Sequence, residues 1–164
     1  MKYAVLYESG SGNTETIAGE IFDAIKAAPE NKLFIDLREA GGIPQADVYY
    51  VGFPVNSFNC SFRIMEVLDQ LQGKTIALFA TCGLKPTEKY KEKIESAMKA
   101  WIDDNTEYLG FFMCQGKVTP EQQQKMLQAQ PDVAEALAQM FREGAQHPDA
   151  EDRKAAADFV KDTQ

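Results

Sequence analysis

Continuous apolar runs that alternate with helical patterns constrain the fold of this chain more than any other feature of its sequence. Most of the runs are unbroken, which is typical of parallel strands covered by helices on both faces. Such an alternation predicts the element order βαβαβαβαβ and a doubly wound parallel α/β sheet. The five runs are Tyr3 to Tyr7, Leu33 to Leu37, Val48 to Phe53, Thr75 to Ala80 and Tyr108 to Met113.

Three helical patterns lie between these runs. Residues 14–28 and 62–71 each carry an apolar stripe that ends near a proline or a glycine. A third pattern, over residues 86–103, places Met98 and Trp101 on one stripe. We therefore expect Trp101 to pack in the core.

The residues after the fifth run exceed what one covering helix requires. Thr119, with a proline and a glutamine close behind it, predicts a helix start. We expect an extra helical segment over residues 119–144 and a final helix over residues 149–162. One of them packs on the sheet and the other is surplus. No linker divides the chain, so residues 1–164 are predicted to form a single domain.

Charge and hydropathy limit the partners and the location. The chain has 17 basic and 25 acidic residues, a net charge of -8, which disfavours nucleic acid and anionic membranes and favours a partner with a basic face. The longest apolar stretch, Val48 to Val55, is too short to span a bilayer, and no signal peptide is evident. A cytoplasmic protein is expected.

The cysteines predict neither a metal site nor a disulfide framework. There are three of them, Cys60, Cys82 and Cys114, and none forms a CxxC pair. The interpretation of Cys82 that we favour is a small buried thiol. The single histidine, His147, precedes a proline and is expected in a surface turn.

The segment Ser9-Gly10-Ser11-Gly12-Asn13-Thr14 lies between the first strand and the first helix, where open α/β sheets bind phosphates. Glycines permit close backbone approach, and the hydroxyl groups can donate hydrogen bonds. No lysine or arginine occurs from Ser9 to Ile25, and a Walker lysine is missing. The segment therefore predicts a cradle of neutral donors for a terminal monophosphate.

Three alternatives bear on this segment. A dinucleotide fingerprint would need glycine or alanine where Glu15 stands. A glycine-rich turn that merely joins strand to helix remains open. A response-regulator receiver domain would need an aspartate after the third strand, and Gly52-Phe53-Pro54 contains none.

Three loops together resemble the flavodoxin family over about residues 1 to 116. Residues 9–14 look like its FMN-phosphate signature. Residues 52–56 (Gly-Phe-Pro-Val-Asn) and 80–83 (Ala-Thr-Cys-Gly) are similar to the starts of the two loops that flank the flavin. Residues 115–117 and 147–152 resemble a short bacterial and archaeal subgroup with a helical segment before the final helix.

The resemblance implies a flavodoxin-like five-stranded sheet of order 2-1-3-4-5 and noncovalently bound FMN. The phosphate would lie in the 9–14 loop and the ring between residues 54–59 and 81–84. No catalytic or metal-binding residue is implied. The implied cofactor-binding residues are Ser9, Gly10, Ser11, Gly12, Asn13, Thr14, Pro54, Val55, Asn56, Ser57, Phe58, Asn59, Thr81, Cys82, Gly83 and Leu84.

Two departures from the family pattern concern the ring. Flavodoxins commonly stack an aromatic side chain on each flavin face, and here Phe58 lies in the first loop while Tyr90 lies far along the second. Flavodoxins also often use a glycine in the first loop, whose peptide reorients on reduction. Residues 53–60 contain none, so Asn56 or Asn59 is expected to take a left-handed conformation instead.

Two functions follow from the resemblance. The first is an electron carrier between a reductase and a redox partner with a basic face. The alternative is an FMN-dependent reductase, or the electron-donating accessory of one, acting on a small molecule such as a quinone or tetrapyrrole. Few titratable residues stand near the loops, namely Glu8, Glu15, Lys85 and Glu88, which favours the carrier.

Overall fold

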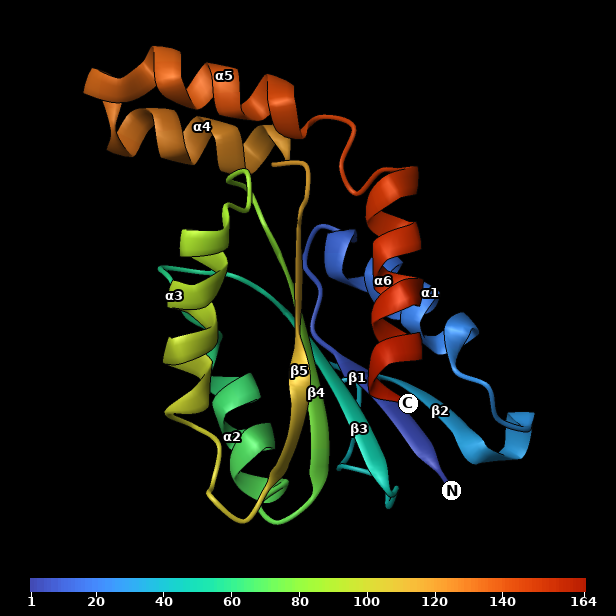
Figure 1. Cartoon of the computed structure of the whole chain (residues 1–164). Coiled ribbons are helices and arrows are strands. Elements are labelled where there is room, and N and C mark those ends of the chain that lie inside the picture. The colour runs from blue at the N-terminus through green and yellow to red at the C-terminus, as the bar shows by residue number, and fades with distance from the viewer.

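A five-stranded parallel sheet forms the centre of the molecule, in a computed structural model that describes residues 1–164 (Figure 1). Its strand order is β2-β1-β3-β4-β5, which confirms the predicted flavodoxin-like sheet. The strands are β1 (Tyr3–Tyr7), β2 (Lys32–Asp36), β3 (Val48–Pro54), β4 (Thr75–Cys82) and β5 (Glu107–Gln115).

The register of the strands brings their carboxyl ends to one edge of the sheet. Tyr7 at the end of β1 pairs with Gly52 of β3, and Pro54 at the end of β3 pairs with Thr81 of β4. Ligands in such sheets bind beyond the carboxyl ends, where the order of the strands reverses. The loops after β1, β3 and β4 therefore meet at this edge.

Helices cover both faces of the sheet (Figure 1). Helices α1 (Asn13–Ala24) and α6 (Ala150–Thr163) share one face, over a cluster of 14 buried residues, and α2 (Phe62–Gln70) and α3 (Glu88–Lys99) cover the other, over a cluster of 19. Burial on both sides explains why the apolar runs are continuous. None of the helices combines the length and the hydropathy needed to cross a membrane.

Two details of the predicted element order were wrong. No helix joins β2 to β3, because residues 40–44 (Ala-Gly-Gly-Ile-Pro) contain two glycines and a proline, which oppose helix formation. Helix α3 is shorter than expected, beginning after the N-cap Thr87 and ending at Lys99. Trp101 therefore falls in the turn beyond the helix and is 41% exposed, not packed in the core.

The tail contains a helical hairpin and the final helix. Helices α4 (Pro120–Ala129) and α5 (Ala134–Gly144) form the hairpin, joined by a short 3-10 turn (Pro131–Val133). Thr119 forms the expected capping box with Gln122. Helix α6 is the one that packs on the sheet, whereas the hairpin extends past the end of α3 (Figure 1). The hairpin is therefore the surplus element.

Candidate functional site

The loop between β1 and α1, here called the cradle loop (residues 9–14), is fixed by three polar contacts. The Gly12 amide donates to Ser9 Oγ at 3.1 Å. Asn13 Nδ2 donates to Ser11 Oγ at 3.1 Å and to the Lys117 carbonyl at 2.8 Å. A Cβ at Gly116 would lie 2.5 Å from Asn13 Nδ2, so a glycine is needed there to admit this side chain. The loop is thus anchored to the segment after β5.

The cradle loop presents backbone donors that no protein group accepts. The amides of Gly10, Ser11, Asn13, Thr14 and Glu15 have no acceptor within the molecule. Helix α1 begins at Asn13 without a side-chain cap, so its first turn leaves these amides open. Unpaired amides at the positive end of a helix dipole favour an anion. The loop therefore fits a phosphate group.

Two buried hydroxyls connect the cradle loop with the end of β4. Thr14 Oγ1 and Thr81 Oγ1 lie 2.8 Å apart, and the residues are 1% and 3% exposed. Two hydroxyl groups carry two hydrogens, and their mutual bond uses one. One hydrogen remains for a third group. The structure thus brings together Thr14 and Thr81, residues that the sequence assigns to different loops.

The first flanking loop (residues 54–59) closes on a tight turn. Asn56 and Asn59 exchange two backbone hydrogen bonds of 2.8 and 3.0 Å. The residues between them, Ser57 and Phe58, have φ values of 49° and 65°. The expectation of a left-handed Asn56 or Asn59 was wrong, because a two-residue loop of this kind places its two central residues in the left-handed region. Each costs about 1 to 3 kcal/mol of strain.

Aromatic side chains from two elements meet above this loop. The ring centroids of Phe58 and Tyr90 lie 6.0 Å apart at an interplanar angle of 72°. Lys93 Nζ lies 4.2 Å from the centroid of the Phe58 ring. Tyr90 therefore belongs to the same region as Phe58, although the sequence separates them widely.

The second flanking loop (residues 81–84) contributes backbone and one exposed side chain. Its Gly83 carbonyl accepts from Gln115 Nε2 at 2.9 Å, and Leu84 is 45% exposed. The Cys82 thiol donates to the Leu84 carbonyl at 3.1 Å, and burial raises its pKa to about 12. Cys82 is thus a buried thiol, as the favoured interpretation expects. Val55 of the first flanking loop likewise packs against the core.

A polar pocket of about 360 Å³ lies beside the cradle loop. The loop contributes one wall through Ser11, Gly12 and Asn13. Lys117 and Arg153 contribute two cationic side chains. The sequence prediction did not include these cations, because only the fold brings residues so distant in sequence to the loop.

His147 lines this polar pocket and joins two aspartates. Its Nδ1 lies 2.6 Å from Asp152 Oδ2 and 3.7 Å from Asp149 Oδ2. Asp149 caps α6 and forms a capping box with Asp152, and the Asp152 amide lowers the pKa of the Asp149 carboxyl. The aspartates therefore serve the start of α6. His147 stands in the turn that the sequence predicts.

The acidic residues nearest the site already have partners. Glu8 Oε2 accepts from Arg63 Nη1 at 2.7 Å. Glu15 Oε1 accepts from the Tyr7 hydroxyl at 3.3 Å, and burial followed by the Glu15 charge raises the pKa of Tyr7 to about 12. Glu8 is therefore held in an ion pair and Glu15 in a hydrogen bond.

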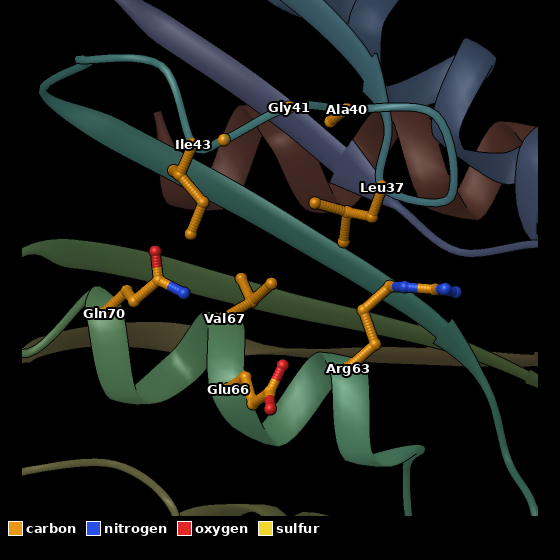
Figure 2. A pocket seen from close by; sticks show the side chains of 9 residues that line it. Leu37, Ala40, Gly41, Ile43, Arg63, Glu66, Val67 and Gln70 are labelled. Atoms are coloured by element: carbon orange, nitrogen blue, oxygen red, sulfur yellow. The ribbon is translucent and has the colours of Figure 1, made fainter.

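A second hollow, of about 170 Å³, lies between the segment after β2 and helix α2 (Figure 2). Figure 2 shows Leu37 and Ile43 facing Val67 across it, with Arg63 at one end. None of the expected cofactor-binding residues lines this hollow. It is therefore separate from the cradle loop.

Comparisons with known proteins agree with this geometry. A family model described as "Flavodoxin domain" matches residues 4–161. A flavodoxin-like domain-containing protein named BilS, from Clostridioides difficile, is 32% identical over 167 aligned positions, which cover 98% of this chain and 95% of that protein. The chain belongs to the flavodoxin family.

Solved structures show the same fold at low identity. General stress protein 14 from Treponema denticola, solved in complex with FMN, has a TM-score of 0.54 and 14% identity, with each chain covered completely. A flavoprotein from Lactobacillus acidophilus, also in complex with FMN, has a TM-score of 0.51 and 20% identity over 69% of this chain and 93% of that one.

Proposed function

We propose that this chain binds FMN noncovalently and carries electrons between a reductase and a redox partner protein. The unpaired amides of the cradle loop are the observation that carries the proposal. They offer several donors at a helix N-terminus, which suits a phosphate monoester. Family membership and the two FMN complexes among similar folds support the same cofactor.

Each part of the site has a role in this proposal. The cradle loop holds the phosphate, and the spare hydrogen of the Thr14–Thr81 pair is available to the cofactor. The two flanking loops hold the ring, with Phe58 and Tyr90 as its aromatic neighbours. FMN supplies the redox chemistry, and the protein binds and orients it.

Electron transport fits the site better than substrate chemistry. Glu8 and Glu15 are both engaged by other side chains, and the Cys82 thiol is buried with a raised pKa. A carrier needs none of these groups, because each electron received from the reductase passes on to the partner and no bond of the protein forms or breaks. A reductase acting on a small molecule would need a proton donor at the ring, and the Tyr90 hydroxyl, whose pKa burial raises to about 12, is the group that this alternative would use.

The first test of this proposal is an absorption spectrum followed by a titration with FMN. We expect yellow protein with bands in the near-ultraviolet and blue, and one FMN per chain. Thr14→Val with Thr81→Val should weaken FMN binding about tenfold or more, because the pair then has no hydrogen for the cofactor and a hydrogen bond to a charged group contributes about 1.5 to 3 kcal/mol. Thr75→Val, at the other end of β4, is the matched control and should bind as the wild type does.

Two results would count against the proposal. Protein that is colourless and takes up no added FMN would show that FMN is not the cofactor. Rapid bleaching of the bound flavin by NADH or NADPH alone would favour the alternative of a reductase, since a carrier should accept electrons only through its reductase.

A further inference from the structure

A line of three lysines, here called the lysine stripe (Lys85, Lys89 and Lys93), leads along the start of α3 to the first flanking loop. Lys89 and Lys93 stand four residues apart and therefore share one face of the helix. Lys93 Nζ lies over the ring of Phe58. None of the three lysines takes part in an ion pair. Their charges are open to an approaching molecule.

The acidic residues of the same helix offset only part of this stripe. Glu92 stands three residues after Lys89 and neighbours it on the helix surface, whereas the positions three and four residues from Lys93 hold no acidic residue. Glu95 accepts from the Tyr108 hydroxyl at 2.7 Å, on the side that faces β5. Of the 17 basic residues, five lie within residues 85–99, which hold three glutamates, so this segment has a net charge of +2 in a chain of -8.

Apolar side chains stand exposed at the same edge of the molecule. Phe58 is 49% exposed and Leu84 is 45% exposed, one in each flanking loop. Lys93 brings positive charge directly against this apolar surface, because its Nζ lies over the ring of Phe58, and apolar side chains beside charge are suited to a protein interface.

Local charge decides what this edge attracts at close range. At physiological ionic strength the Debye length is about 8 Å, so charges farther away are largely screened. The lysine stripe lies at the flanking loops, while much of the negative charge lies elsewhere on the chain. The net charge alone favours a basic partner, but the charges nearest the loops favour an acidic partner.

We infer that the redox partner docks on Phe58, Leu84 and the lysine stripe through an acidic rim around an apolar centre. The inference rests on the proposed function, because the flavin ring is expected between the loops that carry Phe58 and Leu84. It replaces the expectation of a partner with a basic face.

The test measures electron transfer from the photoreduced protein to two acceptors, acidic cytochrome b5 and basic cytochrome c, by stopped flow. In each reaction one electron leaves the reduced flavin and converts a ferric haem to the ferrous state. For cytochrome b5 we expect a rate that falls as salt is added, as for opposite charges. For cytochrome c we expect a rate that does not fall with salt.

Two double variants with the same change in total charge separate local from net charge. Lys89→Glu with Lys93→Glu should slow the reaction with cytochrome b5 about tenfold at low salt. Lys26→Glu with Lys74→Glu changes two exposed lysines outside the docking surface and should leave the rate within about twofold. Equal losses in the two variants would show that only net charge acts and would overturn the inference.

A preference for cytochrome c, strengthened by the Lys89→Glu and Lys93→Glu pair, would also overturn it. The spectrum and the FMN titration come first, so a failure of cofactor binding is seen separately. In that case isothermal titration of the protein with each cytochrome at low salt tests the docking surface directly. Binding of cytochrome b5 that is lost in the Lys89→Glu and Lys93→Glu variant supports the inference, and no binding contradicts it.

Discussion

The cradle loop and the helical hairpin lie at the same edge of the molecule but depend on the rest of it to different degrees. The cradle loop begins a helix whose Ile17 and Ile21 are fully buried in the 14-residue cluster. The hairpin has a small core of its own, in which Leu137, Met140 and Phe141 each keep 8% exposure. The site is therefore built on the sheet, and the hairpin is an attachment.

The hairpin lies closely against the ends of β4 and β5 at two glycines. A Cβ at Gly83 would lie 3.1 Å from Val118 Cγ2, and one at Gly144 would lie 3.1 Å from Gln115 Nε2. Because Met140 and Phe141 are buried within the hairpin, they do not form the exposed docking surface that a surplus amphipathic helix could have offered. The two regions should therefore lose stability independently.

Phe79→Ala should have the largest effect, because Phe79 is fully buried between the sheet and α1. Its ring also occupies the space left by Gly52, where a Cβ would lie 2.0 Å from it. We expect the free energy of unfolding to fall by about 3 to 5 kcal/mol, measured by urea denaturation. An effect below about 1 kcal/mol would contradict the central role of this core.

Gly12→Ala should have the next largest effect and act on the cradle loop itself. Gly12 has a φ of 94°, which disfavours any side chain, although a Cβ there would meet no atom. We expect a loss of about 1 to 3 kcal/mol of stability and weaker binding of FMN. Gly10→Ala is the matched control for stability, since its Cβ is equally free and its φ lies outside the left-handed region. Equal losses in the two variants would exclude the backbone explanation.

Met140→Ala tests whether the hairpin can lose stability without the sheet. The hairpin core should loosen, so hydrogen exchange of the α4 and α5 amides should accelerate. The main unfolding transition should change by less than about 1 kcal/mol, since the core of the sheet is untouched. A loss as large as that of Phe79→Ala would show that hairpin and sheet unfold as one unit.

Asp149→Asn should have the smallest effect, and one that depends on pH. The Asp152 amide holds the pKa of the Asp149 carboxyl below its ordinary value of 3.8, so the carboxylate stabilises the fold above that pH. This contribution disappears as the pH falls through the lowered pKa. The urea midpoints of wild type and variant should therefore differ at pH 7 and converge as the pH falls below the ordinary carboxyl value of 3.8. A difference between the two midpoints that grows as the pH falls would contradict the expected pH dependence.

The sequence predicts those parts of the fold that depend on local pattern. Continuous apolar runs give the strands, and the spacing of Ser9 to Thr14 gives the loop with the unpaired amides. The strand order and the FMN assignment came from the resemblance to flavodoxins. Pattern failed at Trp101, because the apolar stripe continued past the residue where the helix ends.

Contacts between distant segments could not be predicted from local pattern. Lys117 and Arg153 border the cradle loop only because β5 and α6 return to β1 and α1. The approach of Tyr90 and Lys93 to Phe58 depends on how α3 lies over the sheet. The left-handed Ser57 and Phe58 follow from the closure of a turn between two asparagines. The turn contains no glycine that would have indicated left-handed residues in the sequence.

The paired hydroxyls of Thr14 and Thr81 allow the cradle loop to respond to a ligand by reversing one hydrogen bond. The bond between them can run in either direction, and rotation of two O–H groups reverses it without moving a heavy atom. An anion beside one partner selects a single direction. The group that accepts the remaining hydrogen would therefore set the direction of this bond, and no heavy atom has to move for it to reverse.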